Sequence, residues 1–208
     1  MIPSIKRNIR QLSQSPPHWL ALSLATACIV LQYMGLSDLL RFERSLIDSG
    51  HWWLLLSGNF VHLGPNHLWM NLAGLALIVA LVWNHFTASQ WLVVILLSSV
   101  CVGVGLWLFN PEVIGYVGFS GTLHGLILAG TLADLRVYPK SAAVLLLLVV
   151  GKLFWEQYFG ALPGSESVAG GRVVVDSHLY GAIAGAVFGL ILLAWRLLGD
   201  HRRQLSQS

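Results

Sequence analysis

Charged residues are scarce in this chain. Its 208 residues include 12 Lys and Arg and 9 Asp and Glu, so 10% of the chain is charged, whereas soluble domains carry about 25%. Hydrophobic residues make up 56%, and the mean hydropathy is +0.71. A soluble fold of this size cannot hide so much apolar surface. The composition therefore excludes an ordinary soluble enzyme and a disordered protein, and it predicts that most of the chain lies in lipid.

Cysteine is equally scarce, with only Cys28 and Cys101. Each lies near the middle of an apolar run, and their spacing does not resemble a zinc site. We interpret both as small buried hydrophobic side chains, which excludes a disulfide-stapled secreted module. The net charge of +3 is small and most of the basic residues lie in loops, so they indicate membrane topology rather than nucleic-acid binding.

The sequence contains several long apolar runs. Six stretches are long enough to cross a hydrocarbon core of about 30 Å. They cover about residues 18–36, 66–83, 91–109, 118–135, 141–159 and 177–198. All seven prolines lie outside these stretches or at their edges, where they cost no helical hydrogen bonds. Since lipid offers no partner to an open backbone, we predict an all-α membrane protein with a six-helix transmembrane bundle.

The lysines and arginines set the expected orientation. With the N-terminus inside, eight of them lie on the inner side and four on the outer side, which favours cytoplasmic N- and C-termini. We therefore divide the chain into a cytoplasmic N-terminal segment (1–17), a membrane domain (18–198) and a cytoplasmic tail (199–208). Two long loops, residues 37–65 and 160–176, are expected on the outer side.

Polar side chains are costly inside a bilayer, so each one there needs a reason. His67 and Asn71 follow the start of the second stretch, and His178 follows the start of the sixth. Ser120 and His124 lie in the first turns of the fourth. These three helices run inward from the outer face, and at 1.5 Å per residue the five side chains share a layer about 5–10 Å deep. We expect them to lie together.

Glycines explain how these groups can meet. The fourth stretch carries Gly118, Gly121 and Gly125 along one side, and the sixth carries Gly181, Gly185 and Gly189. Such faces let transmembrane backbones approach closely. Packing of the two faces brings the Ser120 hydroxyl within hydrogen-bond reach of His178, which is the nucleophile and base pair of acyl transfer.

His67 and Asn71 are four residues apart and share one helix face. Both side chains can donate a hydrogen bond. Together with the backbone N–H of Ser120 they form a candidate oxyanion hole. The alternative is that they only bridge neighbouring helices through hydrogen bonds.

At these residues the chain resembles the rhomboid intramembrane serine proteases. The shared motifs are His-x-x-x-Asn at 67–71, Gly-x-Ser-Gly at 118–121 and His-x-x-Gly-x-x-x-Gly at 178–185. His62 also fits the pattern of the family as a supporting residue. The resemblance spans about residues 50–190. It implies a serine-type endopeptidase with a Ser120–His178 dyad, no third carboxylate, no metal and no cofactor, which cleaves transmembrane proteins near the outer face.

Within that family the chain is similar to the rhombosortase branch. The similarity rests on the small six-helix body, the stretch from Ser120 to Gly125 and the Trp155-Glu156 pair. It implies a multi-pass protein of the bacterial inner membrane whose site opens to the periplasm. The implied partners are membrane-anchored proteins with a C-terminal sorting tail, made of a Gly-Gly motif, a transmembrane helix and a basic cluster.

Several residues keep two interpretations. His124 stands where the family commonly has an aromatic residue beneath the catalytic histidine, so it either orients His178 or offers a second base. Trp155 and Glu156 are candidates for substrate contact, and Glu156 also suits an ion pair with Lys152 four residues earlier. Asp176 suits the start of a helix, although it lies close enough in sequence to orient His178.

Two other functions remain open at this point. One is an inactive relative of the family that binds transmembrane helices. The other is a metal or haem site, or a small transporter, because several histidines lie towards the outer side. However, no His-Glu-x-x-His motif occurs. The first loop is also expected to be built differently from that of many rhomboids, since Trp52 is followed by Trp53 and not by arginine.

Overall fold

The computed structural model describes residues 17–205, so the predicted N-terminal segment, except Pro17, and residues 206–208 lie outside it. All six predicted apolar stretches are helices. They are α2 (His18–Tyr33), α6 (Pro65–Val82), α7 (Ala88–Phe109), α8 (Ser120–Asp134), α9 (Pro139–Phe159) and α11 (Val175–Leu205). Helix α11 continues without a break through the first part of the predicted tail, and its candidate membrane span ends at Gly199.

Within the described residues, four helices are long and apolar enough to cross a membrane. They cover Pro65–His85, Ala88–Phe109, Pro139–Phe159 and Val175–Gly199. Helices α2 and α8 are shorter, with 16 and 15 residues. At 1.5 Å per residue α8 is about 22 Å long, less than the hydrocarbon core of about 30 Å. Helix α8 is therefore too short to reach both surfaces of the hydrocarbon core, and its first residue can lie below the surface that its longer neighbours reach.

Helix α8 forms the centre of the bundle. All of its residues are buried except Ser120 and His124. The glycine faces of α8 and α11 are in contact: a Cβ on Gly181 would overlap the carbonyl oxygen of Gly121, and a Cβ on Gly185 would overlap that of Gly125. The two backbones approach so closely that only glycine fits at these points. This contact sets the distance between the starts of the two helices.

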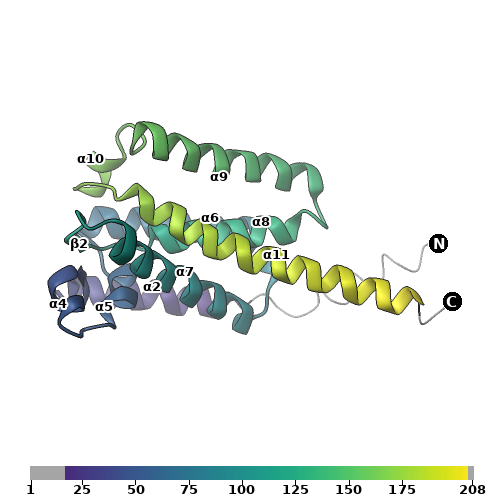
Figure 1. The fold of residues 1–208 in the computed structure, drawn as a ribbon, viewed down its shortest axis with the longest axis horizontal. Helices are drawn as coiled ribbons and strands as arrows, with labels where there is room; N and C mark the ends of the chain where they lie inside the picture. The colour runs from purple at the N-terminus through teal and green to yellow at the C-terminus, as the bar shows by residue number, and fades with distance from the viewer. Residues whose placement is uncertain (1–16, 206–208) are drawn as a thin grey trace.

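Short elements gather at one end of the bundle, on the left in Figure 1. They are α3 (Ser37–Leu40), β1 (Phe42–Glu43), α4 (Arg44–Asp48), α5 (Leu54–Ser57), η1 (Gly58–Phe60), β2 (Gly115–Tyr116) and α10 (Ser165–Ala169), whereas η2 (Trp83–His85) follows α6. Strand β1 pairs antiparallel with β2, with Phe42 opposite Tyr116. This pairing ties the first loop to the segment that leads into α8.

The first loop is anchored by Arg44 rather than by a residue after Trp52. The Arg44 guanidinium donates hydrogen bonds of 2.8–3.1 Å to the carbonyl oxygens of Leu106, Trp107, Asn110 and Val113. The last carbonyls of a helix lie where the helical hydrogen-bond pattern stops, so this one side chain joins the end of α7 to the turn that follows it. Trp52 and Trp53 are exposed, and Trp52 packs edge-to-face on Trp107 with ring centroids 5.5 Å apart.

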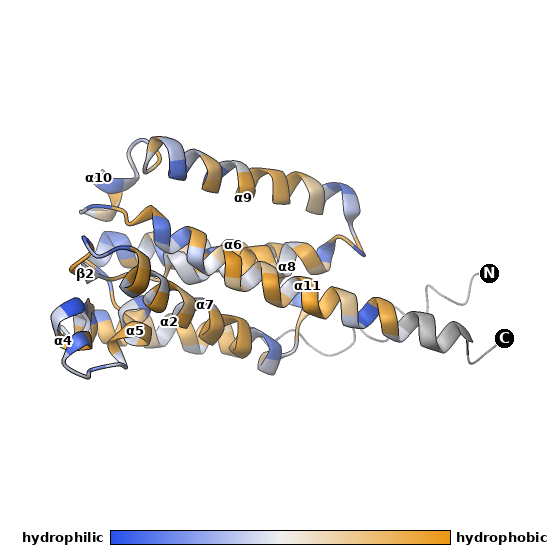
Figure 2. Cartoon of the chain, viewed as in Figure 1, coloured by the Kyte–Doolittle hydropathy of each residue, from blue (hydrophilic) through white to orange (hydrophobic). Residues whose placement is uncertain are grey.

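The outward helix faces are apolar, as a lipid environment requires. Figure 2 shows hydrophobic residues along the length of α7, α9 and α11, with hydrophilic residues concentrated at the end that carries the short elements. Helix α9 is the least enclosed of the four candidate spans. Only 17% of its most apolar stretch is buried inside the protein, against 28–44% of the corresponding stretches in the other three. It packs on α8 and α11 at the edge of the bundle (Figure 1).

Candidate active site

The turn before α8 places Ser120. The sequence pattern predicts a helix from residue 118, but Gly118 has a φ of +126°, a conformation that L side chains rarely adopt. The helix therefore begins at Ser120. A Cβ on Gly118 would also lie 2.6 Å from Cε1 of His67. Gly118 thus supplies both the turn into α8 and the space for the His67 ring.

Hydrogen bonds hold this turn in place. The N–H of Gly118 donates to the carbonyl oxygen of Gly58 at 3.0 Å, and the Tyr116 hydroxyl donates to the carbonyl oxygen of Gly118 at 2.8 Å. Burial raises the pKa of Tyr116 to about 12, so this hydroxyl stays a donor at any physiological pH. Ser120 is the first residue of α8, and its N–H is among the donors that a helix start leaves unpaired.

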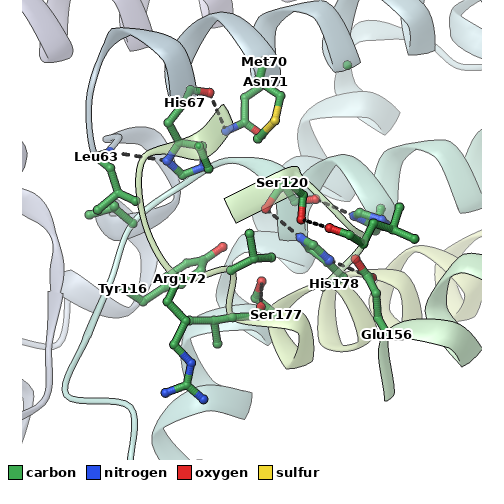
Figure 3. Close-up of a pocket in the computed structure, with 18 of the residues that line it drawn as sticks. Leu63, His67, Met70, Asn71, Tyr116, Ser120, Glu156, Arg172, Ser177 and His178 are labelled. Atoms are coloured by element: carbon green, nitrogen blue, oxygen red, sulfur yellow. Dashed lines mark hydrogen bonds and ion pairs between the residues drawn. The ribbon is translucent and has the colours of Figure 1, made fainter. Parts of the chain in front are cut away.

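The Ser120 hydroxyl faces His178 across the contact between α8 and α11. Its Oγ lies 2.9 Å from Nε2 of His178, as Figure 3 shows. The His178 side chain is buried, whereas Ser120 stays partly exposed. The structure thus brings together the two residues that the sequence motifs single out, at the distance a proton transfer needs.

A carboxylate lies on the other side of the His178 ring. Oε2 of Glu156, in α9, is 2.9 Å from Nδ1 of His178. An ionised carboxylate only accepts hydrogen bonds, so Nδ1 carries the proton and Nε2 presents its lone pair to Ser120. The resemblance implies no third carboxylate, and on this point the expectation is wrong for the structure of this chain.

The structure supports one of the other roles predicted for residues near Glu156 and gives no support to another. Its predicted ion pair with Lys152 is present, with Nζ 2.6 Å from Oε1. Trp155 is 42% exposed, its ring packs on Phe159, and the lining of the cavity around Ser120 does not include it. Sequence reasoning missed the contact between Glu156 and His178. The available signal was a carboxylate inside an apolar helix at the depth of the motifs, which requires a partner.

Lys152 completes a ring of hydrogen bonds that starts and ends at the serine. Besides Glu156, its Nζ contacts Nε2 of His124 at 3.0 Å. Nδ1 of His124 contacts the carbonyl oxygen of Ser120 at 2.7 Å. Because a carbonyl only accepts, His124 carries its proton on Nδ1 and accepts from Lys152 at Nε2. The order of the ring is Ser120, His178, Glu156, Lys152, His124 and back to Ser120.

His124 also supports His178 directly. The two imidazole rings stack with centroids 4.2 Å apart and planes 20° from parallel. Both nitrogens of His124 are engaged elsewhere, with Lys152 and with the Ser120 backbone. This geometry favours the orienting interpretation of His124 over the interpretation as a second base.

The same cluster is the candidate metal site of the described residues. Ligand atoms of His124, Glu156 and His178 lie within 4.8 Å of one another. The Lys152 ammonium already bonds to two of these three side chains. A metal ion would have to displace this ammonium, so the cluster is built around an internal cation.

His67 and Asn71 line a cavity together with Ser120. The N–H of Leu63 donates to Nδ1 of His67 at 3.4 Å, which leaves the proton on Nε2. The Asn71 amide donates to the carbonyl oxygen of His67 at 3.1 Å and retains a second N–H. Both side chains thus have a donor left for a ligand in the cavity (Figure 3).

His62 packs behind His67. Its ring is 1% exposed and meets the His67 ring edge-to-face at 5.2 Å. Neither ring nitrogen has a hydrogen-bond partner within residues 17–205. Burial, reinforced by the neighbouring His67, lowers the pKa of His62 to about 3. His62 is therefore a neutral packing residue that fixes the position of His67.

The cavity has a volume of about 500 Å³, within the usual range for binding sites. Residues of α6, α8, α9 and α11 line it, together with residues of the segment from Leu162 to Val174. Arg41 and Arg172 lie on its lining. Ser120 and His178 are also on its lining, so a ligand that fills the cavity meets the hydroxyl.

Two further groups fix the helices that carry the site. The Asn59 amide donates to the carbonyl oxygen of Ser99 at 3.1 Å and accepts from the Thr122 hydroxyl at 3.3 Å, inside the bundle. Asp176 accepts a 2.8 Å hydrogen bond from Asn110, which ties the start of α11 to the end of α7. Asp176 is thus engaged with Asn110 instead of His178.

Comparison with known proteins gives one match. A family model described as a rhomboid domain matches residues 49–195, more than two thirds of the chain. No curated protein sequence matches the chain. The matched region contains His67, Asn71, Ser120, Glu156 and His178.

Proposed function

The chain belongs to the rhomboid family of membrane-embedded serine proteases, and from this premise we propose that it is an active intramembrane endopeptidase. The observation that carries the proposal is the 2.9 Å contact between Oγ of Ser120 and Nε2 of His178. The ring nitrogen opposite this contact faces a carboxylate, so the imidazole is held in the tautomer that can accept a proton.

The geometry supports acyl transfer to Ser120. Its Oγ attacks the carbonyl carbon of a peptide bond while Nε2 of His178 takes the hydroxyl proton. The oxyanion that forms accepts hydrogen bonds from the Ser120 N–H, His67 and Asn71. His178 then gives its proton to the leaving amine, and the acyl-enzyme remains. Water attacks the ester with His178 again as base, which releases the new carboxyl terminus and restores the serine.

We propose six membrane crossings with both termini in the cytoplasm of a bacterial cell and the cavity open to the periplasm. Support comes from the shorter apolar helix α2 and the buried central helix α8, which with the four longer spans make six, and from the basic residues, eight against four. With this orientation Ser120 lies near the outer face but below the membrane surface, because α8 is short.

The proposed substrates are membrane-anchored proteins with a C-terminal sorting tail, as for a rhombosortase. The cavity wall includes Met70 and Gly74 of α6 and Lys152 of α9. Helix α9 packs on α8 and α11 and is the least enclosed span. A substrate helix is therefore proposed to reach Ser120 from the bilayer, between α6 and α9.

Co-expression with two reporters tests this proposal. The first reporter ends in a Gly-Gly motif, a transmembrane helix and a basic cluster, and the second carries the transmembrane segment of a general rhomboid substrate. We expect the wild type and the control Ser141→Ala, an exposed serine at the start of α9, to cut the first reporter, and Ser120→Ala to leave it intact. Cleavage of the second reporter alone would overturn the sorting-tail specificity and keep the protease.

A further inference from the structure

We infer that Glu156 is a positioning residue that holds the proton of His178 on Nδ1, and that Lys152 holds Glu156 for this task. The inference rests on the proposed function of Ser120 and His178. It adds to that pair a carboxylate on a third helix. The Glu156 side chain is 3% exposed, and its two oxygens have separate partners, Lys152 at 2.6 Å and His178 at 2.9 Å.

A local ion pair does not account for this arrangement. Lys152 and Glu156 are one helical turn apart, so an exposed pair of this kind would contribute only a few tenths of a kcal/mol. Here the pair is turned towards the protein interior and Glu156 is buried. An ionised carboxylate is costly in such a place unless it is paired and fully hydrogen-bonded. Lys152 supplies the charge, and His178 supplies the second hydrogen bond.

Because the Lys152 ammonium lies nearby, Glu156 determines which ring nitrogen of His178 carries the proton. Nζ of Lys152 lies 3.5 Å from Nδ1 of His178, at the outer limit of a hydrogen bond, whereas Oε2 of Glu156 lies at 2.9 Å. Without the carboxylate, Nδ1 would face an ammonium, which only donates. The imidazole would then favour the proton on Nε2, where it would point at the Ser120 hydroxyl and could not accept the proton of the serine.

The carboxylate also stabilises the reaction path. When the Ser120 proton moves to Nε2, His178 becomes a cation with N–H groups on both sides. Glu156 then accepts from this imidazolium and offsets its charge without itself taking the proton. Lys152 stays bonded to the other carboxylate oxygen and to His124, so the position of Glu156 does not change during the transfer.

The test uses the full-length protein in detergent, with the rate of labelling by a fluorophosphonate probe as the readout. We expect Glu156→Gln to slow labelling about 100-fold or more, the range of general acid–base effects. Glu156→Asp should restore part of the rate, because it keeps the charge. The control Gln157→Ala changes an exposed neighbour on the same helix and should label at the wild-type rate.

A spectroscopic measurement separates positioning from a merely structural role. NMR of protein with ¹⁵N-labelled histidine reports which ring nitrogen of His178 carries the proton. We expect Nδ1–H in the wild type and Nε2–H in Glu156→Gln. Lys152→Met combined with Glu156→Gln should be no slower than Glu156→Gln alone, since the ammonium then no longer opposes the correct tautomer.

The outcomes distinguish this inference from the proposed function. Wild-type protein that no probe labels would overturn the protease itself. A wild type that is labelled, together with Glu156→Gln labelled at a similar rate or with an unchanged His178 tautomer, would overturn the role of Glu156 and leave the Ser120–His178 pair standing. Additive losses in the double variant would assign Lys152 and Glu156 to independent structural roles.

Discussion

The imidazole ring of His124 lies flat against that of His178, with centroids 4.2 Å apart. Stacked aromatic pairs contribute about 0.5–1.5 kcal/mol beyond their buried area. His124→Phe keeps this stacking and removes both ring nitrogens. We expect the fluorophosphonate labelling rate of His124→Phe to stay within about tenfold of the wild type, and His124→Ala to be slower because its ring support is gone.

A large loss of labelling in His124→Phe would change the assignment of the base. If His124→Phe lost labelling as completely as His178→Phe, His124 would take part in proton transfer. All three variants, His124→Phe, His124→Ala and His178→Phe, are measured at the same pH and detergent concentration, and their folding is checked by thermal unfolding.

The close contact between α8 and α11 predicts a loss of stability for small substitutions. A Cβ on Gly185 would overlap the backbone oxygen of Gly125, so α8 and α11 must separate to accept it. Overpacking of this kind costs about 1–3 kcal/mol. We expect Gly185→Ala to lower the free energy of unfolding in SDS titrations by this amount and to slow probe labelling. Gly151→Ala on α9 is the matched control, because its Cβ would meet no atom within 4 Å; an equal loss there would contradict the account.

One guanidinium binds carbonyl oxygens at the end of α7 and in the turn after it. Arg44→Lys keeps the charge, but an ammonium cannot reach all four carbonyl oxygens that Arg44 contacts. Hydrogen bonds to charged groups contribute about 1.5–3 kcal/mol each. We expect a loss of about 2–3 kcal/mol in the free energy of unfolding, together with faster proteolysis of the first loop. Lys140→Arg, an exposed cation at the start of α9, should change neither property.

His62 predicts how stability depends on pH. Its folded-state pKa is about 3, below an unfolded value of about 6.5. Between these values the unfolded chain binds more protons, so stability rises with pH and is lost as the pH falls from 6.5 towards 3. The His62 contribution to this loss is about 2 kcal/mol at pH 5.

The variant His62→Leu isolates that contribution. The difference in unfolding free energy between pH 7 and pH 5 should be smaller for His62→Leu than for the wild type by about the same 2 kcal/mol. Equal pH dependence in the two proteins would show that the His62 ring is protonated or hydrated in the folded state.

The positions of Ser120 and His178 could be predicted from the sequence because local patterns determine them. Apolar runs predict the six main helices but not the short ones in the loops, glycine spacing predicts which faces pack, and 1.5 Å per residue gives the expected depth of each polar group. Helix ends were less predictable. Helix α7 begins at Ala88 rather than near residue 91, because Thr87 and Gln90 form a reciprocal cap that interrupts the apolar pattern.

The contacts of Glu156 and Arg44 could not be predicted in the same way. Hydropathy indicates how deep Glu156 lies in α9, but it does not indicate that α9 turns this side chain towards α11. Arg44 begins the short helix α4, and its four acceptors become its neighbours only when the first loop packs on the end of α7, next to the pairing of β1 with β2. Both contacts depend on how separate segments pack, which a local sequence pattern does not encode.

The central claim is that Ser120 is a nucleophile activated by His178. The most direct measurement is the intact mass of the purified protein after reaction with a fluorophosphonate probe, with the modified residue identified by fragmentation. The account predicts one adduct, located on Ser120, in the wild type and none in Ser120→Ala or His178→Ala. A folded wild type without an adduct, or equal labelling of Ser120→Ala, would contradict the account, and the first of these results would favour a family member that binds transmembrane helices without cleaving them.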